Sequence, residues 1–311
     1  KAYIMHTVHA YYYSLGARLR VTGEDASDFL QSQFSQDLRN FETGQCTYGL
    51  WLDVKGKVIA DSWVLCEDAE RFWIVSEHCS ANVLQEKLER HIIADDVCIE
   101  VFASAPACSV IGVDAAGLLE ISPKPDTFVR GQDCIIFCGR RSLEPSYEIV
   151  FDDLNALNNF EEHLQTCGGV LPAKDPWIQQ QRIAAAIPLV PQEIGTTDLP
   201  GEGGFIDDAV SLTKGCYLGQ EVVARMHNLG KARRALYRVQ GSGKAPDCPQ
   251  VLRTEAGKVA GELRTAFNLA NAWQGVALMK LLHLQTSTPI STELGAVEII
   301  SPLRDTTDAS K

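Results

Sequence analysis

The sequence predicts an α+β protein made of two related sheet-and-helix units followed by a small antiparallel β-domain. Three observations support this class. In the first hundred residues the patterns follow the order strand, helix, hairpin, strand, helix, strand. A similar order begins near residue 107, and after residue 234 only short strands remain, separated by Gly, Pro and polar turns. A chain of 311 residues is long enough for two or three such domains.

The first unit is expected to span residues 1–104. Alternating polar and apolar residues predict a strand over 17–22. Glu24 and Asp25 then open a helix whose dipole they complement, and apolar residues at helical spacing continue it as far as Leu38. Further strands are predicted over 45–53, 57–65 and 72–75, with a second helix over 80–91. This order is typical of a mostly antiparallel sheet with helices on one face.

The second unit is expected to span residues 105–234, and the β-domain residues 235–311. The second unit has predicted strands over 109–113, 128–130, 134–139 and 147–151, and a predicted helix over 153–166. Between 171 and 213 the chain is rich in Pro and Gly, interrupted by one short helix over 176–186. Long ordered loops in compact domains more often carry function than not. Short strands over 235–239, 258–263 and 275–282 complete the chain.

Composition excludes several classes of protein. The apolar fraction of 45% and the charged fraction of 22% are those of an ordinary soluble globular protein. The net charge of −12 repels polyanions, so generic nucleic-acid binding is not expected. No window has the length of a membrane-spanning helix, so no membrane association is expected. No secretory signal is visible, although the first residue is not Met, so a leader was either removed or never included.

Ten cysteines without paired CxxC spacing argue against a zinc ribbon or a disulfide scaffold. We therefore predict no permanent metal site. The simplest inference is a reducing compartment, either the cytosol or the mitochondrial matrix.

The most informative segment is the Lys-Gly-Cys-Tyr-Leu-Gly-Gln-Glu stretch over residues 214–221, called the signature below. Its two glycines tolerate positive φ and predict a tight loop. Cys216 would be presented at the bend, where the cation of Lys214 favours a reactive thiolate. The alternative interpretation is a small buried hydrophobe, which is what most free cysteines are. Cys216 differs from most of the other cysteines because its neighbours are polar, charged or glycine.

Basic residues follow the signature, and they are Arg225, His227, Lys231, Arg233, Arg234 and Arg238. Two interpretations of this run are open. It is either a solvated helix face or the edge of a pocket for an anionic ligand, such as a phosphate or the glutamate tail of a folate.

The signature, continued by Val222-Val223-Ala224-Arg225, resembles that of the YgfZ-type folate-binding proteins. These proteins are relatives of the glycine-cleavage T protein, an aminomethyltransferase, and include iron–sulfur assembly factors. The resemblance extends to Phe29–Gln33 with Asp37, Leu52–Lys57, Arg182-Ile183 with Ile187-Pro188, and Leu199-Pro200. It spans roughly residues 15–300 and is strongest at the signature.

The resemblance implies a ring of two α+β units and a C-terminal β-barrel around a central folate pocket. It implies binding of tetrahydrofolate or a folate derivative. It also implies a role in iron–sulfur cluster assembly, and through cluster enzymes an effect on tRNA thiomodification. Cys216 and Lys214 are the residues expected to carry the chemistry. Residues expected to bind the cofactor are Asp53, Trp177, Arg182, Tyr217, Gln220, Glu221 and Arg225.

Each of these residues also has an ordinary interpretation. The indole of Trp177 suits a flat pterin ring but also suits a core. Asp53 flanks a hairpin turn, and Gln220 and Glu221 fit the cap of a helical turn. A stable cluster usually needs about four thiolates, and the signature offers one. Any cluster is therefore expected to be transient and shared with a partner.

Three functions remain open from the sequence. The first is a folate-dependent accessory protein for cluster assembly or repair, acting on its client enzymes through Cys216. The second is an aminomethyltransferase with one-carbon transfer activity, although the T protein has no thiol at the position of Cys216. The third is a non-catalytic scaffold that senses folate. We expect a monomer whose partners are folate and either iron–sulfur assembly proteins or client enzymes.

Overall fold

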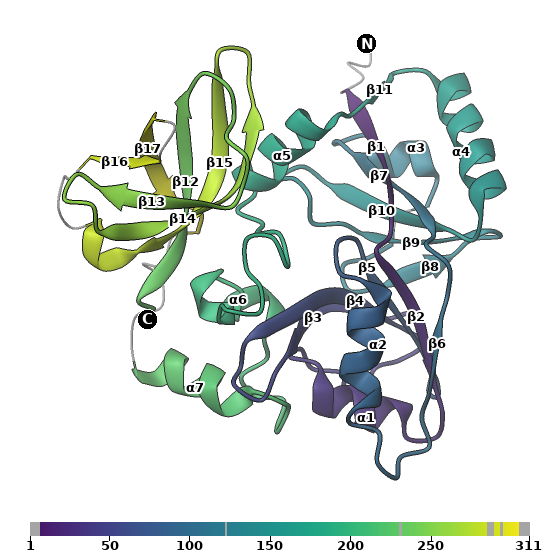
Figure 1. Ribbon diagram of the computed structural model, residues 1–311. Coiled ribbons are helices and arrows are strands. Elements are labelled where there is room, and N and C mark those ends of the chain that lie inside the picture. The colour runs from purple at the N-terminus through teal and green to yellow at the C-terminus, as the bar shows by residue number, and fades with distance from the viewer. Residues whose placement is uncertain (1–6, 122, 230–231, 285–288, 293–294, 305–311) are drawn as a thin grey trace.

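The computed structural model describes residues 7–121, 123–229, 232–284, 289–292 and 295–304. Figure 1 shows two sheets with their helices and a β-barrel beside them. The predicted α+β class and the antiparallel C-terminal β-domain are confirmed, and the C-terminal strands close into a barrel. Within the described ranges, the helices lack the combination of length and apolar character that crossing a bilayer would require.

The first sheet has five antiparallel strands in the order β3-β4-β5-β2-β6, with two helices packed on it. Its elements are β2 (Ala17–Thr22), α1 (Ala26–Gln33), β3 (Cys46–Leu52), β4 (Val58–Asp68), β5 (Arg71–Ser76), α2 (Ala81–Glu89) and β6 (Cys98–Val101). The prediction that α1 reaches Leu38 is wrong. Phe34 turns to an extended backbone and bridges Trp51, which ends the helix at Gln33. Phe34 and Leu38 are nevertheless fully buried, so their spacing imitates a longer helix.

The second sheet has six strands in the order β11-β1-β7-β10-β9-β8. Its elements are β1 (Val8–Ser14), β7 (Pro106–Ile111), α3 (Ala115–Leu119), β8 (Phe128–Arg130), β9 (Cys134–Cys138), β10 (Ser146–Phe151), α4 (Leu154–Cys167) and β11 (Val170–Pro172). The N-terminal strand β1, which the sequence did not predict, pairs antiparallel with β7 and parallel with β11. The sheets therefore do not follow the expected boundary at residue 104. The units 1–104, 105–234 and 235–311 remain a prediction.

The two sheets pack against each other through one apolar face each. Leu15, Trp73 and Val75 come from the first sheet and its approach, and Ile135 and Phe137 come from the second. They share one buried cluster, which fixes the distance between the sheets. The cavity described below lies at this interface.

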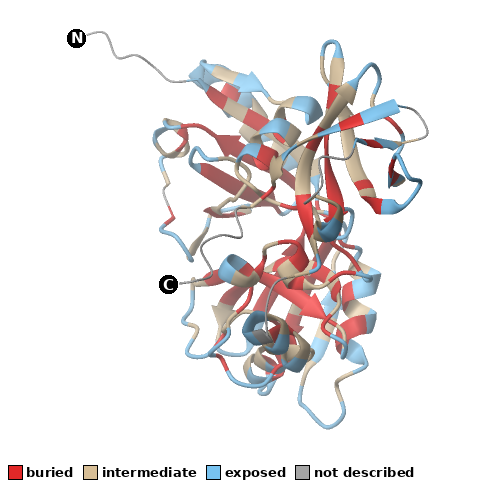
Figure 2. Cartoon of the chain, turned by 90° about the vertical axis from the view of Figure 1, so that its left-hand side faces the viewer, coloured by how far each residue is buried: buried red, intermediate tan, exposed pale blue. Residues whose placement is uncertain are grey.

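The remaining segment and the barrel complete the chain. Their elements are α5 (Asp175–Ala184), η1 (Pro200–Glu202), α6 (Ile206–Ala209), α7 (Gln220–Leu229), β12 (Arg234–Ser242), β13 (Gln250–Thr254), β14 (Val259–Asn268), β15 (Ala272–Lys280), η2 (Leu281–His283), β16 (Ile290–Thr292) and β17 (Gly295–Pro302). The largest core cluster joins α1 and α2 to the long loop, α7 and the barrel. Buried residues run through the sheets and the segments between them (Figure 2). The barrel is therefore packed on the rest of the protein rather than tethered by a linker.

Candidate functional site

The signature forms the loop that leads into α7, includes the first two residues of that helix, and packs on the β3–β4 turn. Gly215 and Gly219 adopt φ of 94° and 84°. A Cβ on Gly219 would lie 2.6 Å from the carbonyl oxygen of Asp53 and 3.0 Å from the Cα of Gly56. Only glycine allows this close approach of the two backbones. The sequence thus dictates both the bend and its contact.

Lys214 anchors the loop from within. It is 2% exposed, and its ammonium donates to the carbonyl oxygens of Gln31, Phe34 and Gln36 at 2.6, 2.5 and 3.0 Å. Burial lowers its pKa to about 7. All three donors of the ammonium are directed to backbone carbonyl groups in the last turn of α1 and just after it. The ammonium therefore holds the signature loop against the end of α1, and its predicted effect on the Cys216 thiol remains a prediction.

Cys216 follows at the bend with its side chain exposed. The next residue, Tyr217, points the other way and is 6% exposed within the core. Its ring lies 5.1 Å from the Lys214 ammonium, and burial raises its pKa to about 12. Among the described residues its hydroxyl has no hydrogen-bond partner. The loop thus holds one side chain inward and presents the thiol outward.

Other predicted residues on α7 and the first hairpin lie around the same loop. Gln220 begins α7, and Glu221 and Arg225 are exposed on it. Asp53 accepts hydrogen bonds from the backbone N–H groups of Lys55 and Lys57, both at 2.8 Å, so its carboxylate closes the hairpin turn. In the basic run, Lys231 lies outside the described residues.

Trp177 and Arg182, on α5, lie elsewhere. Trp177 stacks on His9 with ring centroids 4.1 Å apart. Arg182 donates to the Glu193 carboxylate at 2.6 and 3.1 Å, and Glu193 is fully buried. Thr265 of the barrel donates to the same carboxylate at 2.5 Å. Glu193 of the long loop therefore links Arg182 of α5 to Thr265 of the barrel.

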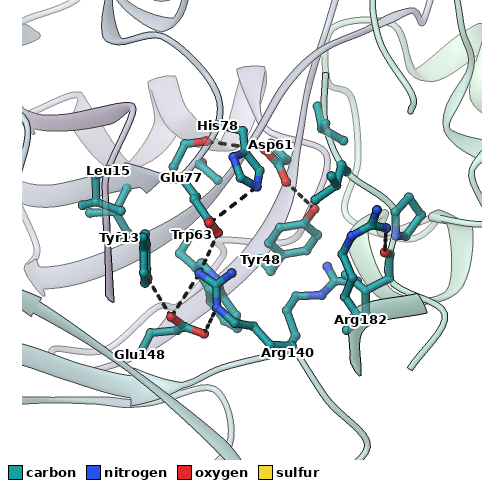
Figure 3. A pocket seen from close by; sticks show the side chains of 18 of the residues that line it. Tyr13, Leu15, Tyr48, Asp61, Trp63, Glu77, His78, Arg140, Glu148 and Arg182 are labelled. Carbon is teal, nitrogen blue, oxygen red and sulfur yellow. Dashed lines mark hydrogen bonds and ion pairs between the residues drawn. The ribbon is translucent and has the colours of Figure 1, made fainter. Parts of the chain in front are cut away.

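A cavity of about 100 Å³ opens between the two sheets. Figure 3 shows the side chains that converge on it. Its aromatic walls are Tyr13, Tyr48, Trp63 and Phe137, and its polar groups include Asp61, Glu77, His78, Arg140, Arg141, Glu148 and Arg182. The ring centroids of Trp63 and Phe137 are 5.1 Å apart, and those of Tyr48 and Trp63 are 5.7 Å apart. The cavity thus combines flat apolar walls with convergent charges, as binding sites for small molecules do.

Asp61, on β4, is half-buried and contributes a carboxyl group to this cavity. It accepts hydrogen bonds from the Tyr48 hydroxyl at 2.7 Å and from the Cys79 thiol at 3.3 Å. Burial raises the pKa of Asp61, and the hydrogen bonds from Tyr48 and Cys79 oppose this. A carboxyl with a raised pKa keeps its proton to a higher pH than an exposed one does.

Arg141 organises the opposite wall. Its guanidinium lies 2.6 Å from Glu77 and 3.0 Å from Glu148. Glu148 also accepts from the hydroxyls of Tyr13 at 2.6 Å and Ser109 at 2.5 Å, so this buried carboxylate is fully engaged. Arg140 lies over the ring of Tyr48 at 3.8 Å and pairs with Asp208 at 2.5 Å.

The structure brings only part of the predicted site together. Arg182 is the one predicted cofactor residue among those that line the cavity. The signature residues, Asp53 and Trp177 lie outside it, so the thiol of Cys216 is accessible but is not at its rim. The sequence reasoning missed Asp61 and the Arg140-Arg141 pair. A carboxylate in the mostly apolar first part of β4 was the available signal for Asp61.

Comparisons with known proteins show the family to which this chain belongs. A family model described as the GCVT N-terminal domain matches residues 4–211. The crystal structure of the glycine cleavage system aminomethyltransferase T from Bartonella henselae has a TM-score of 0.78 and 16% sequence identity, covering 94% of this chain and 85% of that one. At this identity the likeness shows the fold alone.

Three relatives carry the name tRNA-modifying protein YgfZ. That of Edwardsiella ictaluri is 27% identical over 284 residues, covering 85% of this chain and 81% of the relative. That of Yersinia enterocolitica is 25% identical over 300 residues, covering 92% and 89%. That of Colwellia psychrerythraea is 27% identical over 238 residues, covering 70% and 67%.

The chain has the fold of aminomethyltransferase T, and the match over more than half of its length shows that it belongs to the GCVT family. Within that family it is of the YgfZ type, which confirms the resemblance drawn from the sequence.

Proposed function

We propose that this protein binds tetrahydrofolate or a folate derivative in the cavity between the sheets and supports the assembly or repair of iron–sulfur clusters through Cys216. The names of the YgfZ relatives refer to tRNA modification. We extend this to the present chain as an effect on cluster enzymes that thiomodify tRNA. The cytosol or the mitochondrial matrix is the proposed location.

The observation that carries this proposal is the exposed thiol of Cys216 on a loop whose neighbouring side chains are buried. Lys214 and Tyr217 on either side of it are buried, so the exposed side chain sits on a rigid support. Such a support holds a reacting group in one orientation without spending binding energy to order it. A thiolate at this position is suited to ligate iron or to carry sulfur.

The residues of the cavity fit the chemistry of a folate head. A pterin is a flat heterocycle with N–H donors and with nitrogen and oxygen acceptors along one edge. Tyr48, Trp63 and Phe137 offer faces for stacking, and Asp61 and Glu77 offer carboxyl groups for the edge. The folate would supply a carrier for one-carbon units.

The size of the cavity limits what it encloses. Its volume of about 100 Å³ is below the range of roughly 300–1,000 Å³ of sites that enclose drug-sized ligands. We propose that the head alone enters and that the tail lies in the mouth near Arg140. Its guanidinium suits a tail carboxylate, although Asp208 already pairs with it.

Cys216 contributes one thiolate, whereas a bound cluster usually takes about four. The proposed cluster is therefore transient and shared with a partner. The aminomethyltransferase alternative rests on likeness of fold alone, which does not define a reaction.

The test replaces Cys216 with Ala in a strain whose iron–sulfur enzymes, and therefore whose growth, depend on this protein. We expect thiomodified tRNA and the activity of cluster enzymes to fall to the level of a null strain, while the purified variant unfolds at the wild-type urea concentration. Cys98→Ala is the matched control, because Cys98 is also an exposed cysteine but lies on β6. Wild-type tRNA thiomodification in the Cys216→Ala strain would overturn the proposal.

A further inference from the structure

The last turn of α4 carries a second thiol, paired with an imidazole. Cys167 Sγ lies 3.5 Å from His163 Nε2, and both side chains are exposed. The two residues are four apart on the helix, so they project from the same face. Figure 1 shows α4 on the outer side of the second sheet, with α7 on the other side of the molecule. The pair is therefore separate from both the cavity and the signature.

Two kinds of chemistry suit a cysteine beside a histidine. In one, the imidazole takes the proton of the thiol and creates a nucleophile. In the other, the two side chains bind one metal ion. The position on the helix distinguishes between them.

The C-terminal end of a helix carries partial negative charge, which favours a cation. Lys and Arg are absent from the last turn of α4, and Glu161 and Glu162 precede His163 directly. This negative local field attracts a cation to the pair.

The distance between the two side chains matches a metal pair. Zinc binds cysteine sulfur at about 2.3 Å and histidine nitrogen at about 2.0–2.1 Å, so at a tetrahedral angle the two ligand atoms lie about 3.6 Å apart. The observed separation of Sγ and Nε2 is 3.5 Å. The side chains are thus already spaced to share one ion.

We propose that His163 and Cys167 form a two-ligand site for a divalent cation of Zn²⁺ type. Binding breaks the S–H bond of Cys167, releases the proton to solvent and forms a bond from the sulfur to the metal. The imidazole of His163 ligates through Nε2. Water or the side chain of another molecule fills the remaining positions.

The test titrates the reduced protein with Co²⁺, whose bond to a thiolate gives a charge-transfer absorption band, and then displaces the Co²⁺ with Zn²⁺. A Cys216→Ser background removes the thiol of the signature. In that background we expect the band to saturate at one equivalent. Adding Cys167→Ser should abolish it, while Cys98→Ser, at another exposed cysteine, should leave it unchanged.

His163→Gln distinguishes a pair from a lone thiol. It should weaken Co²⁺ binding at least about tenfold, because even the outer-shell partners of metal ligands cause losses of that size. Both positions are exposed, so circular dichroism should show an unchanged fold. Absence of the band, its survival in Cys167→Ser, or equal affinity in His163→Gln would each overturn the proposal.

Discussion

Arg141 and Glu77 join the two sheets across the cavity, with guanidinium and carboxylate 2.6 Å apart. Arg141 approaches from the second sheet, where it also neutralises the buried Glu148, and Glu77 follows the end of β5. The wall of the cavity therefore depends on a charge network that spans both units. Its geometry cannot be changed at one residue without unpairing another.

Replacing Arg141 with Met tests this network. Glu148 is 4% exposed and would lose its cationic partner inside the protein. We expect the free energy of unfolding in urea to fall by roughly 3–5 kcal/mol, as when one partner of a buried pair is removed. Arg90→Met is the control, because Arg90 and Glu86 form an exposed pair on α2 that should contribute about 0.3–0.5 kcal/mol. Equal effects of the two variants would contradict the network.

Lys214 should make stability depend on pH in a defined direction. Its pKa in the folded protein is about 7, against an ordinary value of 10.5. Between these values the unfolded chain binds more protons than the folded one, so stability rises with pH. Lys214→Met lacks this group. We therefore expect the stability of wild type relative to Lys214→Met to increase from pH 7 towards pH 10.5, measured by urea unfolding. If the difference in unfolding free energy between the two proteins did not change with pH, the prediction would be wrong, and the three carbonyls would hold the ammonium charged.

Gly219 and Gly215 form a matched pair for testing the close approach of the signature to the first hairpin. Both have positive φ, but a Cβ would collide with the carbonyl oxygen of Asp53 only at Gly219. Gly215→Ala should cost about 1–2 kcal/mol, the penalty of the left-handed conformation. Gly219→Ala should cost clearly more, and should also lower the cellular activity attributed to Cys216. The same thermal midpoint for both variants would show that the backbone contact is unimportant.

The elements of this protein were more predictable from the sequence than its site. Period-two and helical patterns located most strands and helices, because burial on one face imposes that spacing locally. Strand β1 was missed, since its partners β7 and β11 lie about a hundred and more residues away. The bend of the signature followed from its glycines. The partners of Lys214, by contrast, are carbonyl groups at the end of α1. Every residue has a backbone carbonyl, so the sequence does not indicate which ones accept these hydrogen bonds.

The cavity shows the same limit. Asp61, Glu77 and Arg141 come from different strands and loops, and only the packing of two sheets brings them together. Two residues of the signature, Lys214 and Tyr217, are buried and lie outside the cavity. Trp177, chosen for its indole face, stacks on His9 instead.

Two tryptophans can be used to distinguish the predicted ligand site from the observed cavity. Trp63 lines the cavity, whereas Trp177, on α5, stacks on His9 of β1. Titrating tetrahydrofolate into the wild-type protein should change tryptophan emission. Trp63→Phe should remove most of that change, while Trp177→Phe should retain it, because stacking of a ligand alters the emission of the indole it touches. Isothermal calorimetry on both variants separates lost signal from lost binding. A change that persists in Trp63→Phe and disappears in Trp177→Phe would move the folate site from the cavity to the face of α5.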